Sequence, residues 1–476
     1  MRKLSFVFIG VLLSLCVEAV GGSFHPRSGE IEFTVYQTTA QHPLKEVKTT
    51  AFSPHKVGEI PFIDLDTLKV SHEYRGIGIC MTDASCWILD QLGQEASGRL
   101  ISEAFGRDGL NMSLLRLNCG SSDYATALYN YNDVRDDVRM KHFSVARDED
   151  YMIPVLKRVI SSRDDFFVFS SIWSCPGWMK DSGQMCGGSL LDKYLPAFAN
   201  YWTAYLKAYA SHGIHIDAIT VQNEPLTDQK YANPATLISA RQEMSLAGKL
   251  LPEAFRKAGL DTKIWIFDHN YKNYERVLTE LSDPAVRANI DAVAWHPYKG
   301  DPVLMQQVRK NYPDIDFHLT ERGMNLLDKA TQNEKWCADL VFGALNNGCS
   351  SYCGWCLALD EDGQPVTGKF HCRGLFEVNL EEKSFRQTPL CTLFHQFSPY
   401  VKRGARIMKV DQPDPELTVI TFRNPDGQYV IVVACDNLGG HRKRIQVKYK
   451  DQYLNMALPL YTWSYSTIIV GNNKCL

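Results

Sequence analysis

The chain has 476 residues, of which 45% are hydrophobic and 22% are charged, as in an ordinary globular protein. Its formal net charge is −3, which gives no support to binding of nucleic acid or of an acidic membrane. A chain of this length can bury a core without disulfide bonds, and it allows either one large domain with an accessory one or two to three smaller domains.

The N-terminal residues differ from the rest of the chain. Two basic residues precede an apolar stretch that runs to Val17, and Val17 and Ala19 match the small-residue pattern of a signal-peptidase site. We therefore predict a secretory signal peptide over residues 1–19 and no integral membrane segment after its removal. The mature protein would be periplasmic or extracellular in a bacterium, and lysosomal or extracellular in a eukaryote.

Short apolar runs alternate with longer amphipathic segments from about residue 76 to residue 395. The runs are nearly continuous in apolar residues, which is typical of parallel strands buried on both faces. They cover residues 76–83, 112–118, 166–173, 217–224, 263–270, 291–298, 316–323 and 351–359. Helical spacing is visible between them, in Leu195–Ser211, within 235–258 and in 333–346.

Eight strands that alternate with helices predict an α/β fold, a (β/α)₈ TIM barrel. A doubly wound open sheet is the alternative. It would normally carry a glycine-rich phosphate fingerprint after its first strand, and the segment that begins at Gly76 lacks the glycine that would open the following helix.

Both flanks of the predicted barrel are rich in β-forming residues. Residues 31–39 and several runs between 416 and 470 favour strands, and Asn424–Gly427 and Asn437–Gly440 predict hairpin turns between the first C-terminal runs. These strands suit an antiparallel β-sandwich side domain built from both chain ends. The expected order is a signal peptide at 1–19, N-terminal sandwich strands at 20–72, the barrel at 73–395 and the C-terminal sandwich at 396–476.

Fourteen cysteines are present, and an exported protein can form disulfides. Cys175 and Cys186 bracket a short loop and are the expected disulfide. Cys349, Cys353 and Cys356 lie close together, but the fourth ligand and second knuckle of a zinc site are missing. Their setting reads as a buried strand, so we expect a packing role and no metal.

Polar residues end most of the predicted strands, where the active sites of TIM barrels lie. Glu224 ends the fourth strand and Glu321 the seventh, nearly opposite each other across the barrel mouth. Glycoside cleavage needs one carboxylic acid to protonate the leaving oxygen and a second carboxylate to attack the anomeric carbon or to activate water. Neither glutamate is decisive alone, since either could cap a helix or pair with a cation, but together they indicate a glycosidase.

Aromatic side chains follow the same strand ends. The residues are Trp173, Trp178, Tyr298 and Trp355. Sugar rings present apolar C–H faces that stack on aromatic rings, although large aromatics can equally cap a barrel core.

The chain resembles glycoside hydrolase family 30, and within it the glucosylceramidase-like branch. The resemblance rests on segments that occur in the family's order: GIGICMTDAS, LYNYNDVRDDVRMKHFSV, SIWSCPGWMK, VQNEP, WHPY, LTERG and GWCLALDEDGQP. It implies a retaining mechanism without a cofactor, with Glu224 as acid/base and Glu321 as nucleophile. It also implies a β-glucoside substrate, either a glycolipid or a β-glucan.

The resemblance further assigns residues that line the sugar subsite: Arg116, Asp123, Trp173, Asn223, Tyr298 and Trp355. Asp123 would bind glucose hydroxyls, Asn223 would contact the 2-hydroxyl and Tyr298 would donate a hydrogen bond to the nucleophile. His296 falls on a structural position. The residues after Glu321 and the loop after Glu224 depart from the branch, which puts a ceramide aglycone in doubt.

Three readings therefore stay open. Within the hydrolase reading, an endo-β-1,6-glucanase competes with a glucosylceramidase-like β-glucosidase. A second class is a carbohydrate-binding protein that has lost catalysis, against which both glutamates speak. A third is a metal-dependent barrel enzyme that would use Asp268, His269 and His296, although no further convergent ligand is visible.

Overall fold

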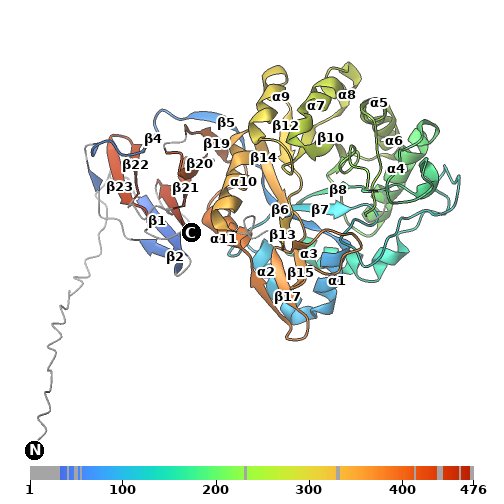
Figure 1. Ribbon diagram of the computed structural model, residues 1–476, viewed down its shortest axis with the longest axis horizontal. Helices are drawn as coiled ribbons and strands as arrows, with labels where there is room; N and C mark the ends of the chain where they lie inside the picture. Colours follow the sequence, from blue (N-terminus) through green and yellow to red (C-terminus); the bar gives the residue numbers. More distant parts are fainter. Residues whose placement is uncertain are drawn as a thin grey trace, which may run out of the picture.

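The computed structural model describes residues 33–39, 42–47, 52–53, 56–229, 233–327, 333–411, 414–436, 443–459 and 463–471. The predicted signal peptide at 1–19 lies outside these residues. A barrel wrapped by helices and a smaller β domain lie side by side, and strands from both chain ends, blue and red in Figure 1, build the smaller domain. Within the described ranges, no helix has the length and apolar character needed to cross a bilayer.

Eight strands close the barrel, and every neighbouring pair is parallel. In chain order they are β6 (Gly76–Met81), β7 (Leu114–Asn118), β8 (Phe167–Ser171), β9 (Ala218–Thr220), β10 (Lys263–Asn270), β11 (Ala292–His296), β12 (Asp316–Leu319) and β14 (Cys349–Gly354). The predicted TIM barrel is confirmed, and the open sheet is wrong. Strands such as β6 and β7 are buried along their whole length, which explains their unbroken apolar runs.

Helices surround the barrel, as Figure 1 shows. They are α1 (Asp83–Gln91), α2 (Gln94–Phe105), α3 (Met152–Ile160), α4 (Leu195–Ser211), α5 (Ala240–Ser245), α6 (Leu251–Ala258), α7 (Tyr274–Leu281), α8 (Pro284–Asn289), α9 (Met305–Asn311), α10 (Glu334–Asn346) and α11 (Pro389–Phe397). Short 3₁₀ turns lie at Ala146–Glu149, Gly177–Met179, Asp192–Tyr194, Tyr271–Asn273 and Pro302–Leu304. The predicted helix over 195–211 matches α4, and a π-helical turn, Leu246–Leu250, joins α5 to α6 within 235–258.

The side domain consists of two sheets packed around an apolar core. One sheet has the order β2 (His42–Val47), β1 (Phe33–Thr39), β24 (Ser464–Val470), β21 (Tyr429–Cys435), β20 (Leu417–Arg423), β19 (Arg406–Lys409) and β5 (Lys69–Glu73). The other has the order β3 (Phe52–Ser53), β23 (Gln452–Ala457), β22 (Arg444–Tyr449) and β4 (Phe62–Asp64). The pairing is antiparallel throughout except between β4 and β22.

One of the two predicted hairpins is correct. Asn424–Gly427 joins β20 to β21, which pair antiparallel. The second prediction is wrong, because β21 and β22 belong to different sheets and the chain crosses between them after residue 436. Turn-forming residues such as Asn437–Gly440, which lie outside the described residues, suit either connection.

Two small sheets lie on the loops after the last barrel strands. β13 (Met324–Asn325) pairs with β16 (Cys372–Arg373), which ties the loop after β12 to the loop after β14. β15 (Ala358–Asp360), β17 (Phe376–Asn379) and β18 (Ser384–Gln387) form the other.

All cysteines in the described part of the chain carry free thiols. The expected disulfide between Cys175 and Cys186 is therefore wrong. The Sγ atom of Cys175 faces the hydroxyl of Thr236 at 3.7 Å, while Cys186 forms a backbone bridge with Pro234. The three clustered cysteines of the last barrel strand are all buried, in agreement with a packing role.

Candidate active site

A pocket opens at the carboxyl ends of the barrel strands. Seven of the nine side chains that the family resemblance assigns to the site line it: Asp123, Trp173, Asn223, Glu224, Tyr298, Glu321 and Trp355. The other two, Arg116 and His296, are fully buried beneath it. The family resemblance implies that Arg116 lines the sugar subsite. In the structure, Arg116 instead lies beneath the subsite and supports it from below.

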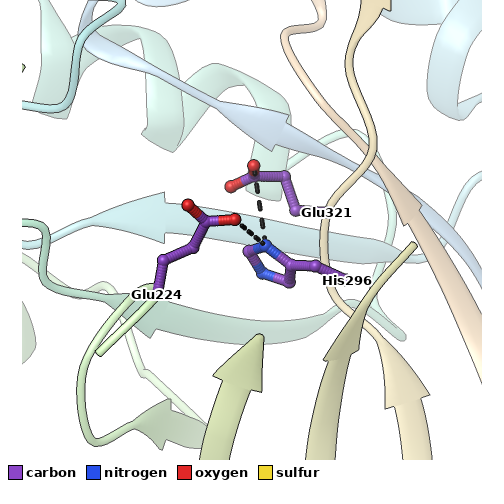
Figure 2. A group of neighbouring side chains, drawn as sticks. All are labelled: Glu224, His296 and Glu321. Carbon is purple, nitrogen blue, oxygen red and sulfur yellow. Dashed lines mark hydrogen bonds and ion pairs between the residues drawn. The ribbon is translucent and has the colours of Figure 1, made fainter. Parts of the chain in front are cut away.

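The two glutamates converge on one point of this pocket. Figure 2 shows both carboxylates facing the same ring nitrogen of His296, Nδ1, which lies 3.1 Å from Glu224 Oε1 and 3.8 Å from Glu321 Oε1. One carboxylate oxygen of each glutamate and the ring nitrogen all lie within 4.8 Å of one another. This spacing is close to the separation of about 5–5.5 Å in retaining glycosidases and well short of the roughly 6.5–9.5 Å of inverting ones.

Glu224 stands on a sharp turn just beyond β9. Its backbone is in the left-handed region, with φ 45°, and its N–H donates to the carbonyl of Asp268 at 3.0 Å. The hydroxyl of Thr227 donates to Glu224 Oε2 at 3.1 Å. The turn therefore aims the side chain across the barrel mouth, and a β-branched neighbour holds its outer oxygen.

Glu321 follows β12 and is held at both of its oxygens. Arg116 Nη1 donates to Oε2 at 2.5 Å, and the Tyr298 hydroxyl donates to Oε1 at 2.8 Å. The Tyr298 hydroxyl itself accepts the backbone N–H of Gly323 at 3.0 Å. Hydrogen bonds of this kind favour an ionised carboxylate, as a nucleophile requires.

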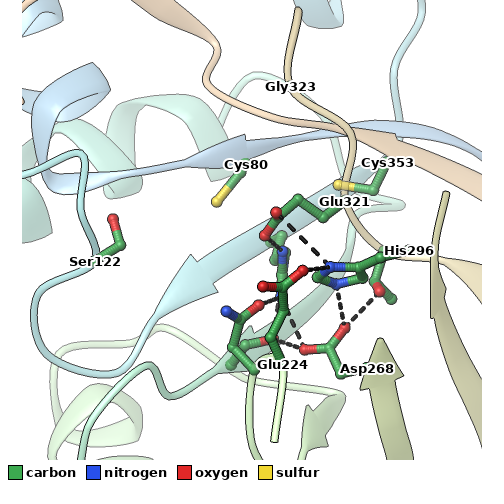
Figure 3. Close-up of polar contacts among 12 residues, drawn as sticks. Cys80, Ser122, Glu224, Asp268, His296, Glu321, Gly323 and Cys353 are labelled. Atoms are coloured by element: carbon green, nitrogen blue, oxygen red, sulfur yellow. Dashed lines mark hydrogen bonds and ion pairs between the residues drawn. The ribbon is translucent and has the colours of Figure 1, made fainter. Parts of the chain in front are cut away.

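Asp268 is the central anion beneath the pocket, and sequence reasoning gave it no role in the glycosidase. It is fully buried and accepts hydrogen bonds at 2.5–3.1 Å from Arg116, Ser171, Thr220, His296 and Thr320. Figure 3 shows His296 between this carboxylate and the two glutamates. Burial raises the pKa of Asp268, but the charges of Arg116 and His296 outweigh burial and hold it well below its usual range.

A one-residue bulge in β10 turns Asp268 inward. Trp265 packs inside the barrel, whereas Ile266 and Phe267 both pack in the outer core. Phe267 and Asp268 have φ 80° and 46°, and the register with β11 shifts at this point. Ile266 and Phe267 are successive residues that face the same side of the strand. The alternation of inward and outward side chains is therefore shifted by one residue, and Asp268 faces the barrel interior.

Glu243 on α5 holds the bulge from outside the barrel. Its Oε1 accepts the Phe267 N–H at 2.7 Å, and its Oε2 pairs with Arg276 Nη2 at 2.5 Å. Arg276 also pairs with Glu280 Oε1 at 2.6 Å. Glu243 and Glu280 are fully buried, so this ion cluster belongs to the protein interior.

The ionisable groups of the site have pKa values that are shifted in different directions. Burial lowers the pKa of His296, but Glu321, Asp268 and the hydrogen bond to Glu224 raise it to about 9. Burial raises the pKa of Glu224, but hydrogen bonds from His269 and His296 hold it below its usual range. For Asp123, burial and then the negative charge of Glu321 raise the pKa to about 8. At neutral pH the ring of His296 is therefore a cation between carboxylates.

Glu224, His296 and Glu321 also have the spacing of a cation site. A metal needs a neutral imidazole nitrogen, whereas both ring nitrogens of His296 face carboxylates and its pKa is raised to about 9. His269 Nδ1 likewise lies 3.6 Å from Glu224 Oε1. The geometry therefore fits a hydrogen-bonded acid–base cluster better than the metal-dependent enzyme considered from the sequence.

Two aromatic rings form the floor of the pocket. Trp173 and Trp355 lie 5.2 Å apart between ring centroids, and the guanidinium of Arg116 packs on Trp173 at 4.8 Å. Trp178 does not join them, since its indole N–H donates to the carbonyl of Asn132 and its ring packs against Tyr194.

The walls of the pocket come from loops that sequence reasoning did not assign. These residues include Thr227, Gln229, Asn233, Asn270, Lys299, Arg322, Phe370, His371 and Cys372. Asn270 is the last residue of β10, and Lys299 and Arg322 closely follow β11 and β12, positions that could have marked them. The others lie farther along the loops, where no pattern in one sequence identifies them.

Several known proteins are similar to this chain over most of its length. The profile of the "glycosyl hydrolase family 30 TIM-barrel domain" matches residues 74–401. An endo-1,6-β-D-glucanase of Neurospora crassa is 30% identical over 347 residues, which cover 70% of this chain and 71% of that protein. The lysosomal acid glucosylceramidase of Mus musculus is 22% identical over 423 residues, covering 84% and 82%.

Solved structures share the fold. SrfJ from Salmonella typhimurium superposes with a TM-score of 0.85 at 23% identity, covering 92% of this chain and 99% of that one. An endo-β1,6-glucanase superposes with a TM-score of 0.81 at 24% identity, covering 92% and 98%.

Proposed function

Since the chain belongs to glycosyl hydrolase family 30, we propose that it hydrolyses β-glucosidic bonds with retention of configuration, through Glu321 as nucleophile and Glu224 as acid/base. The observation that carries this proposal is the approach of the two carboxylates to within 4.8 Å. That distance leaves no room for a water molecule between a carboxylate and the anomeric carbon, so direct attack is favoured over inversion.

In the first step, Glu321 attacks the anomeric carbon while the bond to the leaving oxygen breaks. Glu224 gives a proton to that oxygen, and a covalent glycosyl ester on Glu321 results. In the second step, Glu224 takes a proton from water, the water oxygen attacks the same carbon, and Glu321 leaves as a carboxylate. Sugar and alcohol are released, and both glutamates return to their starting state.

The proton for the first step is held jointly by Glu224 and His296. The raised pKa of His296 and the lowered pKa of Glu224 support a proton that rests on the imidazole side of this pair, whose Nδ1 atom lies 3.1 Å from Glu224 Oε1. A negative charge developing on the leaving oxygen next to Glu224 favours its transfer to the carboxylate and onward. Such a pair titrates as a unit rather than as two separate residues.

The sugar unit would occupy the space over Trp173 and Trp355, with Asp123 and Asn223 on its hydroxyls. Asn223 Oδ1 already accepts from Arg116 Nη2 at 2.8 Å, so its NH₂ group is directed to serve as a donor. Burial keeps Asp123 protonated below about pH 8, and it would therefore donate as well as accept.

Two substrates compete for the aglycone side. A glucosylceramidase-like β-glucosidase is the first candidate, given the glucosylceramidases among the relatives of the chain. An endo-β-1,6-glucanase is the second, and a relative of that name shares 30% identity. Polar side chains such as Gln229 and Lys299 line the pocket and favour a hydrophilic aglycone. Hydrolysis of glucosylceramide and of β-1,6-glucan, measured side by side, separates the candidates.

The proposal for the glutamates is tested with aryl β-glucosides. Glu321→Gln should reduce turnover by about 10⁴-fold or more, whatever the leaving group, because no nucleophile remains. Glu224→Gln should lose about 10²–10⁴-fold on a poor leaving group and little on an activated aryl group, which needs no proton. Glu275→Gln, on the exposed surface of α7, is the matched control and should stay at wild-type activity.

Near-normal turnover by both glutamine variants would overturn the assignment of the two glutamates, whereas no turnover by the wild type would leave the non-catalytic carbohydrate-binding reading. An α-configured sugar as the first product, observed by NMR, would overturn retention alone. Secretion is also part of the proposal. It rests on the predicted signal peptide and is tested by the N-terminal sequence of the mature protein.

A further inference from the structure

Three loops meet at one wall of the pocket, beside Asp123. Asp123 lies after β7, Asn233 lies between β9 and α5, and Gly368 lies between β15 and β16. The carbonyl of Asp123 accepts the N–H groups of Thr367 and Gly368 at 2.7 and 3.2 Å. The backbone of the third loop is thereby fixed against the first.

The amide of Asn233 packs on the bare Cα of Gly368, next to the side chain of Asp123. A Cβ on Gly368 would lie 2.3 Å from Asn233 Oδ1 and 2.8 Å from the Cβ of Asp123. Any side chain at 368 would displace both groups, so the absence of one brings the amide and the carboxyl group together. This arrangement places a neutral amide beside a residue already proposed to bind sugar hydroxyls.

Asn233 is only 3% exposed, yet its amide oxygen has no hydrogen-bond partner among the described residues. Buried side-chain oxygens are nearly always paired, because an unpaired one has lost its water without compensation. Asn233 also lines the pocket. The oxygen packs on Gly368 with almost no accessible surface, so the amide has to turn slightly toward the pocket before a ligand group can donate a hydrogen bond to it. Such a donor would pair an oxygen that otherwise has no partner among the described residues.

We propose that Asn233 binds a hydroxyl of the sugar unit in the pocket and so helps to determine which sugar the enzyme accepts. The inference deepens the proposed function and rests on it. Alcohols both donate and accept, and an amide oxygen beside a carboxyl group can receive one hydroxyl while the carboxyl group receives its neighbour. Sites built to hydrogen-bond a hydroxyl strongly reject analogues that lack it.

The test measures kcat/KM of the wild type and of Asn233→Leu on an aryl β-glucoside and on its 2-, 3-, 4- and 6-deoxy analogues. On the parent glucoside, kcat/KM of the variant should be about 10- to 100-fold lower than that of the wild type, as expected for the loss of one or two hydrogen bonds. On the analogue that lacks the partner hydroxyl, wild type and variant should agree within about threefold, because the bond is absent from both. An equal loss on all five substrates would overturn the proposal.

Asn270→Leu is the matched control. Asn270 lines the same pocket and is similarly buried, at 5% exposure, but its Oδ1 already accepts the backbone N–H of Lys299 at 3.0 Å. This variant should lose activity evenly across the five substrates. Gly368→Ala, which crowds both the Asn233 amide and Asp123, should weaken recognition of the hydroxyls that these two groups bind, with folding checked by Tm.

The wild-type enzyme separates failure of this inference from failure of the proposed function. If it does not cleave the parent glucoside, the proposed function fails, and Asn233 is then tested through the rise in Tm that glucose gives. A rise that is lost in Asn233→Leu and kept in Asn270→Leu would support the amide as a sugar ligand. An equal rise in wild type and both variants would overturn it.

Discussion

Replacement of Glu243 by alanine should impair catalysis from outside the barrel. Its carboxylate accepts the Phe267 N–H at 2.7 Å and pairs with Arg276 at 2.5 Å, and neither partner lines the pocket. The bulge that it holds turns Asp268 toward Arg116 and His296, the two groups that contact the proposed catalytic glutamates. Without this acceptor, the backbone of β10 should shift at Phe267 and Asp268, and the shift should displace the side chains beneath the pocket.

The expected losses of stability and of kcat follow from the contacts that the alanine substitution removes. Phe267 and Asp268 both have left-handed backbone, which costs about 1–3 kcal/mol each and persists only while neighbouring groups enforce it. Glu243 is fully buried, so its removal leaves the Phe267 N–H without an acceptor and leaves Arg276 with Glu280 as its remaining carboxylate, which costs about 1–3 kcal/mol of stability. A shift of Asp268 by about 1 Å would cost on the order of 100-fold in kcat.

The assay combines kcat and KM on an aryl β-glucoside with denaturant unfolding of the same preparations. Glu243→Ala should lower kcat more than it changes KM, and Glu243→Gln, which keeps an oxygen toward Phe267, should recover most of the rate. Glu280→Gln is the control, since Glu280 binds the same arginine but not the bulge. It should lose stability and keep its kcat. Equal kcat values for Glu243→Ala and Glu280→Gln would refute the reasoning.

Two further predictions concern stability. Because the pKa of Asp123 is raised to about 8, the folded state keeps a proton that the unfolded chain releases above about pH 4, so stability falls by about 1.4 kcal/mol per pH unit across this window. Asp123→Asn should remove that loss, and its Tm advantage over wild type should grow from pH 5 to pH 8. Lys180, 3% exposed, donates to Ser174 Oγ and to the carbonyls of Met185 and Ala235. Lys180→Met should cost about 2–4 kcal/mol through the unpaired carbonyls.

Each of these has a contrary outcome. A Tm difference between Asp123→Asn and wild type that stays constant with pH would show that the carboxyl group titrates normally. An unfolding free energy of Lys180→Met within about 0.5 kcal/mol of wild type would show that water replaces the ammonium group at both carbonyls.

The barrel and its two glutamates could be predicted because they depend on local pattern. Strands buried on both faces give continuous apolar runs, and the carboxyl ends of parallel strands meet at one face. Glu224 and Glu321 end the fourth and seventh runs, so their approach follows from strand count alone. The same reasoning could not fix the partner of β22, because turn-forming residues suit a hairpin and a crossing between sheets equally well.

Residues that act through distant contacts gave no such signal. The unpaired amide of Asn233 depends on a glycine more than a hundred residues later in the chain, and a single sequence does not reveal which loops meet. The expected pair Cys175–Cys186 fails for the same reason, since short separation along a loop does not direct two thiols toward each other.

The direction of Asp268 shows why the most consequential residue was the least predictable. Strict alternation from Trp265, which faces the barrel interior, would place Phe267 inside and Asp268 among the helices. Every residue from 264 to 267 is apolar, so the run has no period in which an inserted residue could be noticed. The structure inverts the alternation by one residue and stabilises the inversion with Glu243, a side chain on a separate helix. Asp268, which contacts both proposed catalytic glutamates through Arg116 and His296, thus depends on the bulge in β10. The bulge in turn depends on Glu243, a buried residue that the sequence of the strand does not include.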